Sequence, residues 1–382
     1  MLKVLQDLIS IDSVNPELVS GHAGEAEAAR YLAGVLSDMG LEVRLQEIIP
    51  GRPNVIGIAR GSDPLRYRSI MFNGHLDTVG VERVESPFTP RLEDGKVFGR
   101  GAQDMKGGLA AMAGAIQSIV SSGERHGGDI IFAGVVDEEY KSAGSEGLIR
   151  DYKADGAVVC EPTELNVAIA HKGFCWIKVT TNGRAAHGSR PEEGLDAIAA
   201  MGTFLSCMGR YEKEVLSKRR HIWLGSPSVH ASLISGGREL SSYPDRCELH
   251  LERRTLPGET EDQVQQEMLE LLGEAACRHW TAFNGNVETY FYREAFEVSP
   301  EEDIVKTLSR AFQQVTGLRA ELGGFSAWTD AAILRRAGIP TVVFGPGGGG
   351  LHGLIEYCDV EQLVTATDVL AKAALDFTNT AK

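Results

Sequence analysis

Uninterrupted apolar runs alternate with segments of helical periodicity along the first 172 residues of this chain. Residues 130–136 and 157–160 are continuous apolar runs, as expected for strands that are buried on both faces. Between Ala28 and Met39, apolar residues recur at three- and four-residue steps before Gly40, which predicts an amphipathic helix with a glycine stop. Further strands are expected at 54–59 and 69–73, and a further helix at 105–120. This alternation predicts a three-layer α/β fold with a mostly parallel sheet.

The pattern changes between residues 173 and 286, where it predicts a smaller α+β domain inserted into the larger one. The expected order is strand, helix, strand, strand and helix, at 176–179, 195–208, 228–234, 246–251 and 261–277. The α/β pattern then resumes with a helix at 301–315, a strand at 340–344 and a last helix at 360–377. We therefore expect a large domain of residues 1–172 and 287–382 and an inserted lid or dimerisation domain of residues 173–286.

Metal-ligating side chains occur in five stretches that follow strand-like or glycine-bounded segments. They are His75 and Asp77, Asp104, the run Asp137-Glu138-Glu139, Glu161, and His352. Ligands of open α/β sheets bind beyond the carboxyl ends of the strands, so these side chains are expected to meet there. A solvated loop charge would explain any one of them, but it explains the whole set poorly. The set indicates a two-metal hydrolase site.

The chemistry of the set assigns a task to each residue. Two metal ions that share a bridge need about five protein ligands, and the histidines and carboxylates here suit zinc without any thiolate. His75, Asp104, Glu139, Glu161 and His352 supply that number. Asp77 lies two residues beyond His75, on the same side of an extended segment, so its carboxylate is expected to orient the imidazole. Glu138 remains as the general base that takes a proton from the attacking water. Cobalt and manganese stay open as alternatives to zinc.

These motifs resemble the di-zinc peptidases and deacylases that include acetylornithine deacetylase, succinyl-diaminopimelate desuccinylase, aminoacylases and glutamate carboxypeptidases. The resemblance extends over nearly the whole chain, with the main motifs in the family's order. It implies that Asp104 bridges two metals, with Glu161 beside His75 and His352 beside Glu139. A glutamate at position 161 is typical of the deacylase and carboxypeptidase members, which implies a substrate with a free carboxylate and a blocked nitrogen.

The insert resembles the same family. Residues 183–189 resemble the motif whose histidine enters the active site of the partner subunit, so the resemblance implies that His187 helps to stabilise a tetrahedral oxyanion. Residues 251–258 resemble the segment whose arginine receives the substrate carboxylate. That role falls on Arg254, with Arg253 as the alternative. The resemblance thus implies a homodimer formed through the insert, with each site completed in trans. One departure is the run of four glycines, 347–350, before His352.

Composition narrows the possible partners and compartments. The net charge of −15 argues against nucleic acid as a partner. No apolar run approaches the roughly 18 residues of a membrane span, and the N-terminus lacks a secretory signal. Six scattered cysteines are expected to be reduced, in a cytoplasmic protein. The glycine-rich segment 345–350 formally contains G-x-G-x-x-G, but it lacks the βαβ context of a dinucleotide site.

The favoured interpretation is a metal-dependent amidohydrolase that removes the acyl group from an N-acyl amino acid. The runner-up is an exopeptidase of the same fold, acting on short peptides as a carboxypeptidase or dipeptidase. From a different class, a catalytically silent binding protein could retain the fold, but the full ligand set together with Glu138 argues against it.

Overall fold

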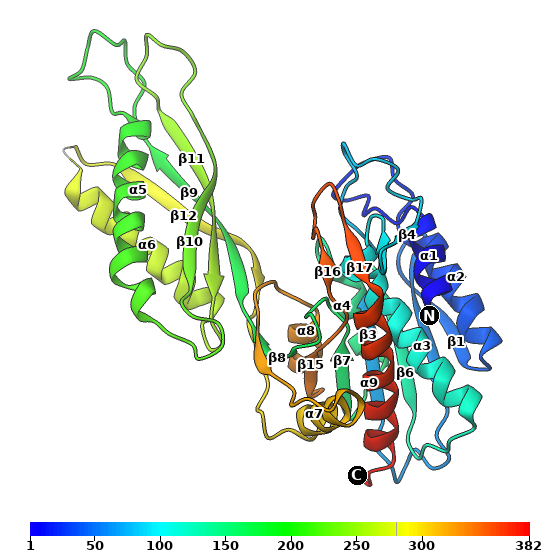
Figure 1. Cartoon of the computed structure of the whole chain (residues 1–382). Helices are drawn as coiled ribbons and strands as arrows, with labels where there is room; N and C mark the ends of the chain where they lie inside the picture. The colour runs from blue at the N-terminus through cyan, green and yellow to red at the C-terminus, as the bar shows by residue number, and fades with distance from the viewer. Residues whose placement is uncertain (280) are drawn as a thin grey trace. The chain divides into compact units, whose positions relative to one another are not determined.

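The computed structural model describes residues 1–279 and 281–382 (Figure 1). The chain divides into two compact units. The first comprises Met1–Ile169, Val298–Gly323 and Thr329–Lys382, and the second comprises Ala170–Glu297 and Gly324–Trp328. Within the described residues, no helix has the length and apolarity needed to cross a membrane.

The first unit is built on a mixed sheet whose strands run in the order β1-β2-β6-β3-β7-β15-β8. The four central strands β6, β3, β7 and β15 are parallel, and the strands on both sides of them pair antiparallel. These strands are β1 (Glu42–Ile49), β2 (Arg52–Ala59), β3 (Ile70–His75), β6 (Ile130–Val135), β7 (Gly156–Val159), β8 (Val167–His171) and β15 (Thr341–Val343). Every residue of β3, β6 and β7 is buried, as expected from the apolar sequences of β6 and β7 and of the first half of β3.

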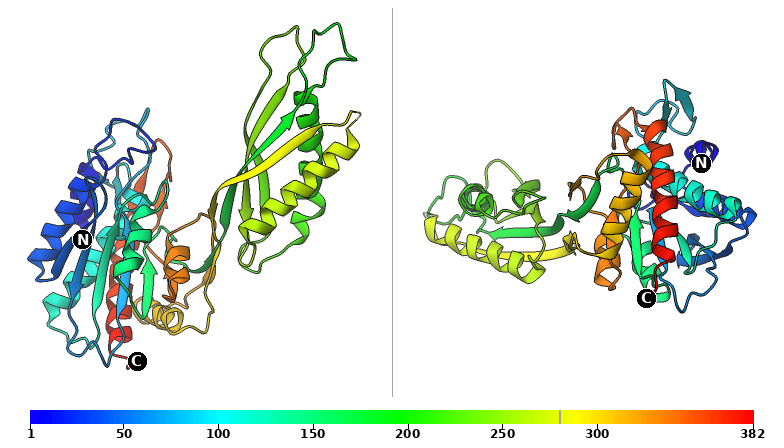
Figure 2. Two further views of the ribbon diagram at one scale, coloured as in Figure 1. Left: turned by 180° about the vertical axis from the view of Figure 1, so that it is seen from behind. Right: turned by 60° about the horizontal axis from the view of Figure 1, so that its bottom comes forward.

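Helices cover both faces of this sheet. Gly57 of β2 faces α2, where an added Cβ would lie 2.9 Å from Leu36, whereas the Asn54 side chain, on the opposite face of the strand, donates to Gly144 O of α4. Helices α3 and α9 pack side by side (Figure 2). The helices are α1 (Leu2–Ser10), α2 (Ala26–Asp38), α3 (Gly107–Ser122), α4 (Ala143–Asp151), α7 (Asp303–Thr316), α8 (Ala331–Arg336) and α9 (Val360–Thr378). The predicted α/β architecture is confirmed, with its parallel part at the centre of the sheet.

A small second sheet in the first unit joins distant parts of the sequence. Its order is β16-β17-β5-β4, with β17 paired to β5. Its strands are β4 (Arg91–Glu93), β5 (Lys96–Phe98), β16 (Gly348–Gly349) and β17 (Tyr357–Asp359). The pairing sets the segment after β5, which leads to Asp104, beside the segment that carries His352.

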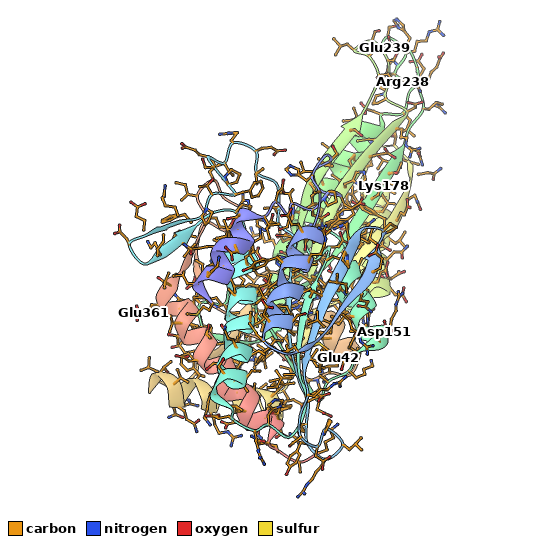
Figure 3. All side chains as sticks on the ribbon, turned by 90° about the vertical axis from the view of Figure 1, so that its right-hand side faces the viewer. Glu42, Asp151, Lys178, Arg238, Glu239 and Glu361 are labelled. Atoms are coloured by element: carbon orange, nitrogen blue, oxygen red, sulfur yellow. The ribbon has the colours of Figure 1, made fainter. Side chains whose placement is uncertain are left out.

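The second unit is an antiparallel sheet, β10-β11-β9-β12, with helices α5 and α6 on one face (Figure 1). Alternate residues of β9, among them Cys175, Ile177 and Val179, belong to the core that these helices cover. The elements are β9 (Gly173–Asn182), α5 (Ala197–Glu214), β10 (Ser228–Gly236), β11 (Arg246–Thr255), α6 (Glu261–Arg278) and β12 (Asn284–Arg293). Arg238 and Glu239 lie in the loop that joins β10 to β11 (Figure 3).

The fourth strand of this sheet, β12, was not expected from the sequence. Only Val287 of its ten residues is buried, so its apolar signal is weak for an edge strand. Because β12 continues to Arg293, the second unit extends beyond residue 286, and the short strand β13 (Phe296–Glu297) follows. Of the remaining pairings, β14 (Leu322–Phe325) pairs with β8.

Candidate metal centre

The structure brings the five predicted ligands together at one edge of the central sheet. His75 is the last residue of β3, Glu139 follows β6, and Glu161 follows β7. These three strands are parallel neighbours, so their carboxyl ends meet. Asp104 lies in the turn before α3, and His352 lies between β16 and β17.

Asp104 is at the centre of this group. Its Oδ1 lies 2.9 Å from His75 Nε2, and its Oδ2 lies 3.2 Å from His352 Nε2. Glu161 Oε1 is 3.9 Å from His75 Nε2, and Glu139 Oε1 is 3.5 Å from His352 Nε2. The two oxygens of one carboxylate thus face two imidazoles, and each imidazole has a further glutamate beside it.

Asp104 reaches this edge of the sheet because the start of α3 lies very close to the backbone at the end of β7. A Cβ on Gly108, in the first turn of α3, would lie 2.0 Å from the Cys160 carbonyl oxygen. Only glycine therefore allows the helix to begin against the end of β7, next to Glu161. The glycines before His352 serve a similar purpose. Gly350 has φ +81°, and a Cβ there would lie 1.6 Å from Ile355 O.

The ionisable groups of this cluster strongly shift one another's pKa values. Burial opposes ionisation of Asp104, but hydrogen bonds with His352 and His75 outweigh it and hold the Asp104 pKa far below its usual range. Hydrogen bonds to Asp104 and Glu139 raise the pKa of His352 to about 10. Burial raises the pKa values of Glu138 and Glu161 well above the ordinary value, and nearby carboxylates add to the rise against the opposing effect of His75. Crowded carboxylates of this kind need nearby positive charge.

The donor set fits divalent metal ions. Donor atoms of His75, Asp104 and Glu139 all lie within 4.8 Å of one another, and the same holds for His75, Glu138 and Glu161. Glu139 Oε1 is buried, and His352 Nε2, at 3.5 Å, lies at the outer limit of hydrogen-bond range from it. Imidazole nitrogens with carboxylate oxygens are a ligand set typical of zinc and neighbouring transition metals.

Asp77 orients His75 through its backbone carbonyl, whereas the sequence predicted that its carboxylate would do so. The contact with His75 Nδ1 at 2.9 Å is made by the Asp77 backbone carbonyl, while the carboxylate oxygen Oδ1 is 3.6 Å away. The Asp77 carboxylate instead accepts hydrogen bonds from the backbone N–H groups of Glu138 and Glu139, both at 3.1 Å. One buried residue therefore orients both the imidazole and the glutamate pair.

Three polar residues behind Asp77, namely Asn15, Arg52 and Glu25, were not expected at the site from the sequence. Asn15 Nδ2 donates to Asp77 at 2.8 Å and to Asp137 at 3.0 Å. Arg52 makes two hydrogen bonds of 2.6 Å to Glu25, which also accepts from Asp137 N at 3.0 Å. All are buried. Asp137 adjoins the glutamate pair in the sequence, but no local motif marks the other three.

The two remaining predicted site residues, His187 and Arg254, belong to the second unit. His187 is exposed, and its Nδ1 lies 2.8 Å from Ser189 Oγ. Arg254 lies on the face of the sheet opposite α5 and α6, stacked 5.3 Å from the Phe174 ring centroid and hydrogen-bonded to Glu252 at 2.6 Å. Arg253 points the other way, is fully buried and pairs with Glu259 at 2.8 Å. Of the two arginines, only Arg254 is accessible.

A known protein family matches most of the chain. Residues 71–376 match the profile of peptidase family M20/M25/M40. The chain belongs to this family. The M20 enzyme is accordingly a metallohydrolase that acts on amide bonds, and the resemblance to di-metal deacylases and peptidases is confirmed.

Several relatives of this M20 enzyme align over most of its length. The N-formyl-4-amino-5-aminomethyl-2-methylpyrimidine deformylase of Bacillus subtilis is 29% identical over 376 residues, with 91% of this chain and 87% of the relative covered. The acetylornithine deacetylase of Myxococcus xanthus is 28% identical, with 98% and 96% covered. Among solved structures, aminopeptidase PepT of Bacillus cereus has a TM-score of 0.82 at 22% identity, with 98% and 97% covered. It shares the fold.

Proposed function

We propose that this M20 enzyme hydrolyses the amide bond of N-acyl amino acids, as a deacylase of the acetylornithine deacetylase or succinyl-diaminopimelate desuccinylase type. The observation that carries the proposal is the cluster of His75, Glu139, Glu161 and His352 around the Asp104 carboxylate, with Glu138 beside it. Relatives named for removal of formyl, acetyl and succinyl groups support a deacylase.

In this proposal, His75 and Glu161 hold one divalent ion, His352 and Glu139 hold a second, and Asp104 binds both. The distances from Asp104 to the two imidazoles support that assignment. When bound, such ions lower the pKa of a water molecule towards ~7 and polarise the substrate carbonyl, and zinc is the favoured metal, with cobalt or manganese as alternatives.

Glu138 acts in the proposal as the proton carrier. It takes a proton from the attacking water and delivers it to the nitrogen that leaves. Its backbone is fixed by Asp77, so the carboxylate is held beside His75 and Glu161. Asp77 itself acts by orienting its neighbours.

The second unit supplies substrate recognition. Arg254 presents a planar, permanently charged fork, which suits a substrate carboxylate. His187 stabilises the oxyanion in the partner's site, so the enzyme is a homodimer assembled through its second units. The edge strand β10 exposes Leu233 and Ile234, which supports a role in that assembly. Free cysteines at all six positions support a cytoplasmic location.

Two alternatives share the same chemistry. An exopeptidase is favoured by the fold of aminopeptidase, tripeptidase and dipeptidase structures. A deformylase acting on the amine of a planar heterocycle is favoured by the pyrimidine-deformylase relatives and by the rings around Arg254. Phe174 contacts Trp176, Phe291 and Trp328 at centroid distances of 5.5 to 6.2 Å.

A substrate panel on zinc-loaded protein separates these functions. It contains N-acetyl, N-formyl and N-succinyl amino acids, dipeptides, and an N-formyl aminomethylpyrimidine, with Glu138→Gln as the blank for contaminating activity. The proposal expects the highest kcat/KM among the N-acyl amino acids. Preference for dipeptides or for the pyrimidine formamide would replace it with the corresponding alternative.

A further inference from the structure

Glu356 is a buried carboxylate that binds the loop carrying Asp104. It is 5% exposed, although it lies on a surface segment between His352 and β17. Its Oε2 accepts from Arg100 Nη1 at 2.7 Å and from Gly101 N at 2.9 Å. Its Oε1 accepts from Gln103 N at 3.0 Å and from Asp104 N at 3.1 Å. Four donors thus converge on one carboxylate, and three of them belong to the backbone of the turn that presents Asp104.

Arg100 extends this contact to two further ligand segments. It is 3% exposed, and besides Glu356 it donates through Nη2 to Gly353 O at 3.0 Å and through Nε to Gly80 O at 3.2 Å. Gly353 directly follows His352, and Gly80 lies in the segment that leaves His75 and Asp77. One buried ion pair therefore touches the segments that carry three of the five ligands.

The ligands differ in how much they depend on this pair. His75 ends a buried strand, and its Nδ1 is fixed by Asp77 O. His352 is different, because half of its side chain is exposed and it follows a run of four glycines. Glycine-rich backbone has more conformational freedom to lose on ordering, so a fixed His352 requires an anchor close by. The Arg100 contact with Gly353 is such an anchor.

We infer that Arg100 and Glu356 are positioning residues that set the metal affinity of the position held by His352 and Glu139. Together they fix the Asp104 turn and the His352 segment, while the position held by His75 and Glu161 is held by strand ends. This inference rests on the ligand set of the proposed function. It goes beyond that function by assigning a site-selective task to two residues that would not themselves touch metal or substrate.

The test is a titration of apo protein with Zn²⁺ in competition with a chromogenic chelator, for wild type and Glu356→Gln. The glutamine keeps the shape but has one acceptor oxygen in place of two, so either the Gln103 and Asp104 N–H groups or Arg100 and Gly101 must face an amide N–H and lose their acceptor. Loss of such supporting contacts typically lowers metal affinity about 10–100-fold. We expect a drop of that size for the ion held by His352 and Glu139, an unchanged affinity for the ion held by His75 and Glu161, and an altered Co²⁺ absorption spectrum at full occupancy.

The matched control is Glu259→Gln. Glu259 also pairs with a buried arginine, Arg253, and accepts from a backbone N–H, that of Leu256 at 2.8 Å, but it lies in the second unit. It should lose stability without losing Zn²⁺ affinity. Arg100→Lys is a second test, because it keeps a cation for Glu356 while losing the fork that also reaches Gly353. It should weaken the same ion, and it decides the matter if Glu356→Gln does not fold.

Wild-type affinity at both positions in the folded variants would overturn the inference, and so would an equal loss at both. Failure of the ligand set on which the proposed function rests has a different signature. In that case wild-type protein itself would bind fewer than two Zn²⁺ ions, whatever the variants do.

Discussion

Glu138 and Glu139 are neighbours in the sequence, yet we propose separate tasks for them. The Asp77 carboxylate accepts hydrogen bonds from the backbone N–H groups of both residues, and this fixes the short turn that carries their side chains. Glu139 approaches His352 and Asp104, while Glu138 lies with His75 and Glu161. The difference arises from which way each side chain leaves the turn, and it makes their substitutions distinguishable.

We expect Glu138→Gln to keep both metal ions and to lose about 10²–10⁴-fold in turnover, because the proton carrier is gone. Glu139→Ala should also weaken one metal position. Metal content per chain and kcat are measured together, with the exposed Glu164→Gln as the control. A Glu138→Gln enzyme that keeps more than about a tenth of wild-type kcat is incompatible with the assigned base.

Arg254 is the residue whose loss should affect recognition alone. Arg254→Ala should raise KM for N-acyl amino acids and cost roughly 2–4 kcal/mol in kcat/KM, since a charge-assisted bidentate contact is lost. Arg254→Lys should recover little of it. Metal content should not change, and the exposed Arg246→Ala on the same strand is the control. Equal turnover of a free acid and its neutral amide by wild type would remove the basis for a carboxylate pocket.

At the scale of elements, the ligands at the ends of the parallel strands could be predicted from the sequence. The residues that hold the ligand segments in place could not. His75, Glu139 and Glu161 follow continuous apolar runs, so a local pattern places each at the active edge. Glu356 binds backbone N–H groups, and Asn15 binds carboxylates, of segments far away in the sequence, and no local pattern marks such contacts. The edge strand β12 was missed for a related reason, because a mostly exposed strand has little apolar signal.

The buried pair between α2 and β2 predicts a stability effect. Burial raises the pKa of Glu25 above its ordinary value, against the opposing hydrogen bond from Arg52. Arg52→Met removes that bond and leaves an uncompensated buried carboxylate, which should cost about 3–5 kcal/mol at neutral pH. Because its pKa is raised, the Glu25 carboxyl binds its proton more tightly in the folded state than in the unfolded state. The loss of stability should therefore shrink as the pH falls towards the pKa of Glu25 in the unfolded chain.

Urea unfolding of apo protein at several pH values measures this effect, always as the difference from wild type. Glu25→Gln combined with Arg52→Met is the control, because it removes both charges and should restore much of the stability at neutral pH. A single-variant loss that does not depend on pH would show that the buried charge is not its cause.

For the whole molecule, the proposal links assembly to catalysis through His187. If His187 serves the partner's site, a Glu138→Gln chain and a His187→Ala chain are each inactive alone but complementary when mixed. Random exchange of equal amounts gives half heterodimers with one intact site each, or about a quarter of wild-type sites. Activity is followed over time after mixing, with exchange verified by differently tagged chains. Verified exchange without recovery would assign His187 to its own chain or to no site.

The central claim is that two divalent ions sit among His75, Asp104, Glu139, Glu161 and His352. Elemental analysis of active protein, combined with its rate before and after chelation, tests this claim most directly. We predict about two transition-metal ions per chain, loss of turnover and a lower melting temperature on chelation, and recovery of both when Zn²⁺ is added back. Active protein that contains no transition metal and is unaffected by chelators would contradict the account.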